Sequence, residues 1–140
     1  MPIIPQKLIW KDEYSVKVKL FDEQHQRLIG IMNDLIDCLN SIGSSDVKID
    51  SLMSLLRKNE LEHFATEEQY FQKFHYPEAA AHILKHRNFI EQCDLLEKSN
   101  ADNVNDRISN IVYFLEDWWI SHICGDDKKY SDFFNDHGLQ

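Results

Sequence analysis

Histidines and carboxylates occupy positions where four predicted helices would be expected to bury apolar side chains. They lie in the segments DEQHQ, EHFATEE, HILKH and HICGDD, as His25, His63, Glu67, His82, His86, His122, Asp126 and Asp127. A buried polar group costs free energy unless it finds a partner. Four helices that carry such groups at about the same depth can satisfy them together by binding metal. This pattern constrains both the fold and the function.

The spacing of the apolar residues predicts four helices, at about residues 22–42, 47–74, 78–98 and 104–124, with a C-terminal extension. Asp22 is the expected N-cap of the first helix, Gly43 and Ser44 end it, and Pro77 precedes the third. The expected buried stripe of the second helix reads Leu52, Leu56, Asn59, His63, Glu67, Tyr70 and Phe74. Short loops between the helices indicate an antiparallel up-down-up-down four-helix bundle, an all-α fold.

The segment before the first predicted helix, about residues 1–21, carries several large apolar side chains. They are Trp10, Tyr14, Val16, Val18 and Leu20. We expect this segment to be an ordered N-terminal arm that packs on the bundle. Arm and bundle together would make residues 1–140 a single domain, which suits a chain of this length.

Composition and charge exclude several classes of partner. The formal net charge of −9 argues against nucleic acid and anionic membranes, which bind basic surfaces. No apolar run approaches the roughly 18–20 residues of a membrane span, and the N-terminus lacks the features of a signal peptide. The three cysteines are widely spaced and form neither a zinc pattern nor a disulfide framework. We therefore expect a cytoplasmic protein, most simply a monomer.

Counting coordination positions indicates the kind of metal centre. Two octahedral metals offer about twelve positions. Five histidines, two bridging carboxylates and one bridging oxygen from water would fill all but one of them, and the remaining position would be open to a small external ligand. Imidazole and carboxylate around six-coordinate metal point to iron, with manganese as a weaker alternative.

Two neighbouring aspartates compete for the role of the second carboxylate ligand. A regular helix favours Asp126, four residues after His122. Asp127 requires a local widening of the helix, such as a π-bulge, or a helix that ends near Gly125. The spacing by itself leaves both residues open.

The chain as a whole resembles the bacteriohemerythrins, which are prokaryotic hemerythrin-like domains. The resemblance is carried by IWKDEYSV, DEQH, HFATEE, HILKH and DWWISHICGDDKKY, and it covers nearly the whole chain. It implies that His25 and His63 bind the iron that takes up oxygen. It also implies that His82, His86 and His122 bind a coordinatively full iron, and that Glu67 and Asp127 bridge the two, with Asp126 a solvated neighbour.

The resemblance further implies a function. Two iron ions with an oxo or hydroxo bridge would bind dioxygen reversibly, for transport, storage or sensing, and the protein would not be an enzyme. The main alternative is a di-iron oxidase or peroxidase. Such enzymes use mostly carboxylate ligands, whereas five imidazoles favour carrying oxygen over activating it. A third alternative is an iron-handling or redox-sensing module with a separate redox or signalling partner.

Trp119 and Ile123 are the candidate residues of the oxygen pocket. Members of the family usually carry leucine three positions before the last histidine ligand, where this chain has Trp119. A side chain at that offset leans over the turn before the ligand. In the alternative arrangement, Trp118 packs inward and Trp119 lies between helices elsewhere.

Overall fold

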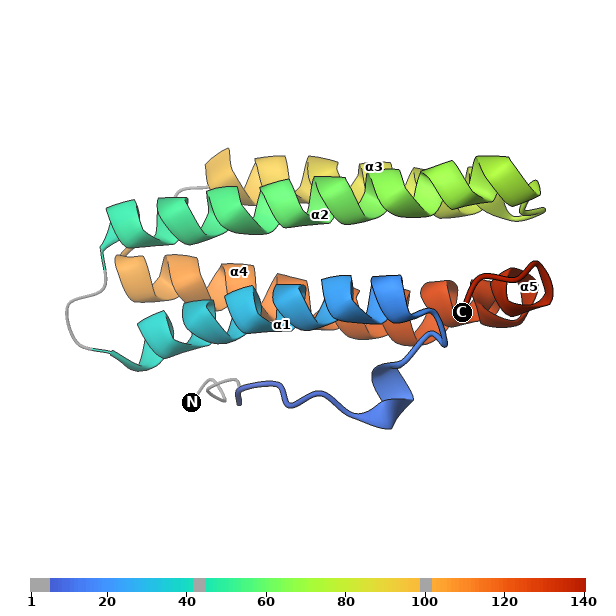
Figure 1. The fold of residues 1–140 in the computed structure, drawn as a ribbon. Helices are drawn as coiled ribbons and strands as arrows, with labels where there is room; N and C mark the ends of the chain where they lie inside the picture. Colours follow the sequence, from blue (N-terminus) through green and yellow to red (C-terminus); the bar gives the residue numbers. More distant parts are fainter. Residues whose placement is uncertain (1–5, 42–44, 99–101) are drawn as a thin grey trace.

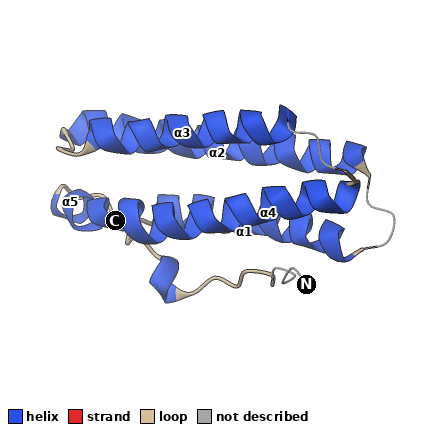
Figure 2. Cartoon of the chain, turned by 180° about the vertical axis from the view of Figure 1, so that it is seen from behind, coloured by secondary structure: helices blue, strands red, loops and turns tan. Residues whose placement is uncertain are grey.

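Four long helices build an antiparallel bundle, as the spacing predicts, and the computed structural model describes them within residues 6–41, 45–98 and 102–140. Their bounds are α1 (Lys19–Asn40), α2 (Asp46–Phe74), α3 (Ala79–Lys98) and α4 (Val104–Ser121). The chain runs in one direction along α1 and α3 and in the opposite direction along α2 and α4, so that each helix is antiparallel to the next (Figure 1). The view from behind shows no strand in the described part of the chain (Figure 2).

The arm is shorter than predicted because α1 begins earlier. The helix starts at Lys19 with Val18 as its N-cap, so Asp22 is not the cap. Instead, the Asp22 carboxylate accepts hydrogen bonds from Ser15 Oγ at 2.6 Å and from the Val16 amide at 2.8 Å, and thereby ties the arm to the helix. Leu20, expected to belong to the arm, lies within α1 and is 37% exposed.

Further along, the arm packs on the bundle as expected. Val16 and Val18 are fully buried, and Asn33 on α1 exchanges two hydrogen bonds with the backbone of Leu8, at 2.7 and 2.9 Å. The arm runs along the outer side of α1 and contains one short 3-10 turn, Asp12–Tyr14 (Figure 1). The predicted end of the first helix, Ile42 to Ser44, lies outside the described residues.

The buried face of α2 differs from the predicted stripe. Residues on it are Ile49, Met53, Leu56, Glu60, His63, Phe64, Glu67 and Phe71. Asn59, expected in the stripe, turns outward and donates to the Leu55 carbonyl at 2.8 Å. Its neighbour Glu60 takes the inward position and is 3% exposed. A buried stripe on a helix can continue after three or after four residues. Packing against the other helices buries Glu60, four residues after Leu56, and not Asn59, three residues after it.

After α4 the chain changes helix type three times. A π-helical turn covers His122–Asp126, a 3-10 turn covers Asp127–Tyr130, and α5 (Ser131–Asp136) follows. The predicted fourth helix, about 104–124, therefore ends as an α-helix at Ser121. Phe134 of α5 is fully buried and stacks on Phe71 with ring centroids 5.8 Å apart, which closes this end of the bundle. No helix in the described ranges is long and apolar enough to cross a membrane.

Candidate metal centre

Seven buried side chains from α1, α2, α3 and the turns that follow α4 meet inside the bundle. They are His25 on α1, His63 and Glu67 on α2, His82 and His86 on α3, and His122 and Asp127 after α4. None is more than 4% exposed. The spacing of four within HFATE and HILKH places each pair on one helix face, which is why two residues from each of α2 and α3 reach the same point.

The seven residues divide into two groups that share both carboxylates. One group brings together Glu67, His82, His86, His122 and Asp127, and the other brings together His25, His63, Glu67 and Asp127. Within each group the potential ligand atoms lie within 4.8 Å of one another. This is the arrangement of two adjacent metal sites, one with three imidazoles and one with two.

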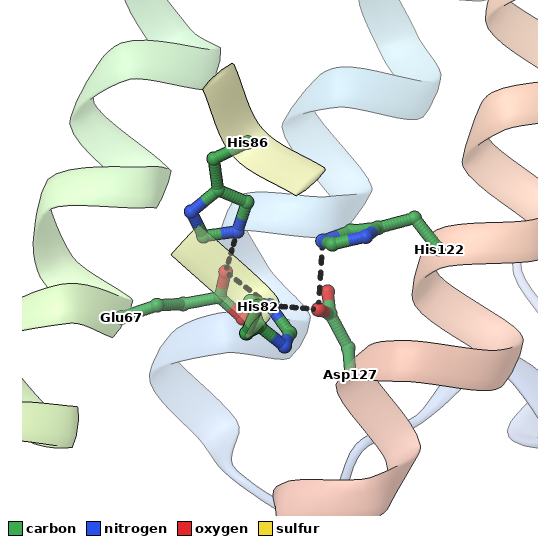
Figure 3. Close-up of side chains that lie close together, drawn as sticks. All are labelled: Glu67, His82, His86, His122 and Asp127. Carbon is green, nitrogen blue, oxygen red and sulfur yellow. Dashed lines mark ion pairs between the residues drawn. The ribbon is translucent and has the colours of Figure 1, made fainter. Parts of the chain in front are cut away.

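Asp127 lies between the two groups of imidazoles. Its Oδ1 is 2.9 Å from His82 Nε2 and 3.0 Å from His122 Nε2, whereas its Oδ2 is 3.1 Å from His25 Nε2. Each carboxylate oxygen thus faces a different group, which suits a bridging ligand. Figure 3 shows Asp127 and His122 opposite Glu67, with the imidazoles turned inward.

Glu67 also faces both groups of imidazoles, but it does so through one of its oxygens. Its Oε1 lies 3.0 Å from His86 Nε2 and 3.4 Å from His63 Nε2, so it too faces a histidine of each group. The two rings of the smaller group approach each other closely, with His25 Nε2 and His63 Nε2 2.9 Å apart.

The π-helical turn explains why Asp127, and not Asp126, reaches the centre. In a regular α-helix, the residue four positions after His122 would share its face. The π-helix over His122–Asp126 adds one residue to the turn, so that the fifth position comes into register. Asp127 is fully buried and Asp126 is not.

The outer nitrogens of three histidines have protein partners. His63 Nδ1 lies 2.6 Å from Gln24 Oε1, and His122 Nδ1 lies 3.2 Å from Asp126 Oδ2. His86 Nδ1 is 3.4 Å from a carboxylate oxygen of Glu68. Acceptors at these positions hold the rings with Nδ1 protonated and Nε2 free to bind metal.

Asp126 is therefore more than the solvated neighbour expected from the sequence. Its side chain is 15% exposed, and it pairs with Lys85 on α3 as well as with His122. It connects the π-helical turn to α3 and orients a predicted ligand at the same time.

Aromatic rings pack directly on the imidazoles of the larger group. The Phe64 ring stacks on His86 at 3.9 Å between centroids, and the Trp118 ring stacks on His122 at 4.3 Å. Phe71 meets His82 edge to face at 4.9 Å. These contacts leave the rings little freedom to turn.

The electrostatics of the cluster depend on the two carboxylates. Burial by itself would lower the pKa of His63, but the charges of Glu67 and Asp127 outweigh it and raise that pKa to about 9. The same carboxylates raise the pKa of His82 to about 10 against the effect of burial. Burial and the neighbouring His63 lower the pKa of His25.

The cluster fits metal because its inner atoms lack other partners. Both oxygens of Glu67 and of Asp127, and Nε2 of His82, His86 and His122, are buried, and outside the cluster they have no hydrogen-bond partner among the described residues. Buried polar atoms are normally paired. A donor set of imidazole nitrogens and carboxylate oxygens suits a transition metal such as iron.

The two tryptophans before His122 take different places. Trp119 is 1% exposed, and its ring meets Tyr14 of the arm edge to face at 4.7 Å. Its indole N–H has no hydrogen-bond partner in residues 6–41, 45–98 and 102–140. Trp118 is half-buried and stacks on His122. Ile123 is 1% exposed, next to the ligand. Trp118 thus packs on a predicted ligand, whereas Trp119 packs against the arm.

Two residues near the centre were not anticipated from the sequence. Tyr130 is fully buried, and its hydroxyl has no hydrogen-bond partner within the described ranges. Burial next to Asp127 and Glu67 raises its pKa. It lies three residues after Asp127, one turn along the same face, which is the signal that could have indicated it. Glu60 lies three residues before His63, one helical turn away on the same face, and that spacing could have indicated it in the same way.

Comparison with known proteins gives consistent matches over most of the chain. A family model described as the hemerythrin HHE cation binding domain matches residues 16–134. The chain is 29% identical to a bacteriohemerythrin of Stenotrophomonas maltophilia, over 93% of this chain and 83% of that protein. It is 28% identical to a bacteriohemerythrin of Clostridium acetobutylicum, over 89% of this chain and 98% of that one.

The fold has a counterpart among solved structures. A crystal structure of wild-type hemerythrin superposes with a TM-score of 0.77 and 27% sequence identity, covering 89% of this chain and 95% of the other. The matched residues 16–134 include all seven of the converging side chains. The chain is therefore a member of the hemerythrin family, with a buried cluster of histidine, glutamate and aspartate that could bind metal.

Proposed function

We propose that the protein binds dioxygen reversibly at a pair of iron ions held by the seven converging residues. The observation that supports this proposal is the unequal division of the imidazoles. Three histidines belong to one group and two to the other, around two shared carboxylates. The metal in the smaller group would have an open position for a small ligand. A ferrous pair supplies two electrons to dioxygen when it is bound.

The protein residues would hold and isolate such a centre. Glu67 and Asp127 would bridge the metals, and the five imidazoles would bind through Nε2, with Gln24 and Asp126 orienting two of the rings. All seven side chains are buried under aromatic and aliphatic neighbours. Such a shell excludes water and reductants, which favours release of the bound dioxygen over its further reduction.

The composition of the donor set supports carrying oxygen over consuming it. Five neutral imidazoles and two carboxylates give the metals less negative charge than the carboxylate-rich sites of ferritin-like di-iron proteins. We infer that the protein is not primarily an oxidase or a peroxidase. We further propose that the protein acts in the cytoplasm, where it would carry, store or sense dioxygen.

The direct test is an absorption spectrum of the iron-loaded protein, taken with a measurement of iron content. We expect about two irons per chain. We also expect charge-transfer bands that disappear on anaerobic reduction and return on exposure to air over repeated cycles. Iron that binds without reversible bands would contradict oxygen binding, and failure to bind two irons would contradict the metal centre.

A steady-state assay separates carrier from enzyme. With peroxide and a reductant, we expect turnover no faster than that of free iron at the same concentration. Sustained faster turnover would favour the peroxidase alternative over reversible oxygen binding.

A further inference from the structure

Glu60 is a buried acid outside the predicted ligand set. Its side chain is 3% exposed and its Oε2 has no hydrogen-bond partner in the described part of the chain. It lies seven residues before Glu67, two turns of α2 away, so both carboxyl groups project from the same face toward the inside of the bundle. Glu60 therefore lies in the layer next to the metal centre, on the side of the N-terminus of α2.

Among the described residues, no cationic side chain forms an ion pair with Glu60. Arg57, one turn away, directs its guanidinium to Asp94 at 2.6 Å and to Glu97 at 3.1 Å, near the surface. On the facing helix α3, burial raises the pKa of the Cys93 thiol to about 12, which keeps it neutral. A buried carboxylate without a partner is costly, so this environment favours the neutral acid.

The other charged groups that act on Glu60 belong to the metal centre. His63 on α2 and His122 after α4 favour its ionised form, whereas Asp127 and Glu67 oppose it. Burial outweighs the histidines and raises the pKa of Glu60 to about 7. No ion pair within 4.0 Å joins Glu60 to any of these residues in the described ranges, so Glu60 is free to interact with a further group.

We propose that Glu60, as a neutral acid, donates a hydrogen bond to a small anionic ligand bound at the metal pair, so that the anion and one proton bind together. This inference rests on the proposed function, because it needs the metals and their open position. Two kinds of ligand would fit. One is a small anion whose outer atom accepts a hydrogen bond, and the other is a ligand that gains negative charge when it binds. An anion in the same buried site favours the acid form of Glu60, because two negative charges there would repel each other.

A route for the proton lies on the side of Glu60 that faces away from the metal centre. Glu60 lines a small cavity between α2 and α3, together with Leu56, Arg57, Leu61, Phe89 and Cys93 among others. The cavity leaves about 10 Å³ for the centre of a water molecule, close to the room that a single water requires. Arg57 and Leu61 are partly exposed and none of the seven candidate ligands lines this cavity, so the proposed route from solvent to Glu60 avoids the metal centre.

The balance of the binding step is simple. Above the pKa of Glu60, where its side chain is ionised, the anion would enter from solvent and bind at the open position, and the Glu60 carboxylate would take one proton from solvent through the cavity. The proton stays on Glu60 Oε2 and is shared with the outer atom of the anion in a hydrogen bond. No bond in the protein breaks and no electron moves.

The test uses azide as the anion and the iron(III)-loaded protein. Azide affinity is measured by absorption titration between pH 5.5 and 9 for the parent protein, for Glu60→Gln and for the control Glu62→Gln. Glu62 is an exposed residue of the same helix. In the parent and the control we expect the affinity to fall about tenfold per pH unit above the pKa of Glu60, as coupling to one proton requires. In Glu60→Gln we expect a shallower fall and an affinity at pH 9 at least about tenfold above the parent.

A second readout observes the proton directly. Infrared difference spectra at high pH, with and without azide, should show the carbonyl stretch of a newly protonated carboxyl group in the parent and the control. That band should be absent in Glu60→Gln. Together the two readouts identify the group that takes up the proton, because competition by hydroxide at the metal is common to all three proteins.

The outcomes that contradict the proposal are distinct from failure of the metal centre. Equal pH dependence in parent and Glu60→Gln, or an unchanged infrared band, would overturn the role of Glu60 and leave the di-iron site intact. Loss of iron in Glu60→Gln would overturn it as well, because Glu60 would then be part of the ligand set. A parent protein that binds no iron would instead contradict the proposed function.

Discussion

Loss of a shared carboxylate should affect both metals, whereas loss of a histidine should affect one. Asp127 faces both groups of imidazoles, with one oxygen turned to each. Asp127→Ala would remove a ligand of both metals, so we expect the paired site to be lost, with less than one metal per chain. Metal content after dialysis measures this, with the exposed Asp132→Ala as the control. Two metals retained by Asp127→Ala would contradict its bridging position.

Asp126 should behave as an orienting residue. Its contact with His122 Nδ1 at 3.2 Å fixes the ring without reaching the metal. We expect Asp126→Ala to keep two metals but to bind them about 10–100-fold more weakly, which is typical for loss of an outer partner of a ligand. A competition titration with a chelator measures the affinity. Loss of the pair, or an unchanged affinity, would show that this contact has another role.

We expect Trp119 to restrict the access of dioxygen to the metal centre. It is fully enclosed, and it presents a larger side chain than the leucine that the family resemblance leads one to expect. We expect Trp119→Leu to speed dioxygen association and change the autoxidation rate while leaving the iron content intact. Stopped-flow mixing of the ferrous protein with oxygen measures the rate. Rates equal to those of the parent would mean that Trp119 only packs against Tyr14.

At the scale of elements, the arm and α1 act as one unit. Asp22 accepts hydrogen bonds from Ser15 and from the backbone of Val16, whose side chain is fully buried. Asp22→Ala would leave a partly buried amide unpaired, so we expect a loss of about 1–3 kcal/mol in the free energy of unfolding. Urea denaturation measures it, with Asp34→Ala, an exposed residue of the same helix, as the control. Equal losses in both variants would contradict this role.

The turn after α4 is the element that completes the centre. The π-helical geometry over His122–Asp126 brings Asp127 inward and leaves Asp126 at the rim. The following 3-10 turn and α5 place Tyr130 and Phe134 on the same end of the core. A regular continuation of α4 would have exchanged the two aspartates.

At the scale of the whole molecule, we expect metal binding and folding to be coupled. Without metal, several buried nitrogens and oxygens of the cluster have no hydrogen-bond partner outside it in the described part of the chain, at a cost of roughly 1–3 kcal/mol for each unsatisfied group. We therefore expect the metal-loaded protein to unfold at a clearly higher temperature than the metal-free form. Thermal unfolding followed by circular dichroism measures the difference, and equal midpoints would contradict the coupling.

The difference between the two forms should grow with pH. In the metal-free protein, the pKa of His63 is raised to about 9 and that of His82 to about 10. A histidine whose pKa is raised by folding stabilises the folded state. This stabilisation is fully present below the pKa of the unfolded state, about 6.5, and is lost as the pH rises through the pKa of the folded state. Metal, in contrast, needs the neutral imidazoles.

Two measurements check this pH dependence. The gain in thermal midpoint on metal loading should be larger at pH 9 than at pH 6, and acid should release the metal. A gain that is constant over this range would mean that the two histidines are not protonated in the metal-free fold.

Much of the fold and of the centre could be predicted from the sequence. The helical spacing of His63 with Glu67, and of His82 with His86, is local information that places each pair on one face. The scarcity of glycine and proline within the helices, and the turn signals between them, indicated the up-down-up-down order. The structure brings together the seven residues that the family resemblance implied, whereas the helical pattern alone had left Asp126 and Asp127 as alternatives.

The tertiary structure decided what depends on contacts between helices. The sequence alone could not choose between Asn59 and Glu60, because steps of three and four residues both follow the α2 stripe, and only packing selects the buried one. The outer partners of the ligands, such as Gln24 and Asp126, lie on faces whose direction is set by neighbouring helices. Local periodicity determines which faces can be buried, whereas the positions of the other helices determine which side chains meet there.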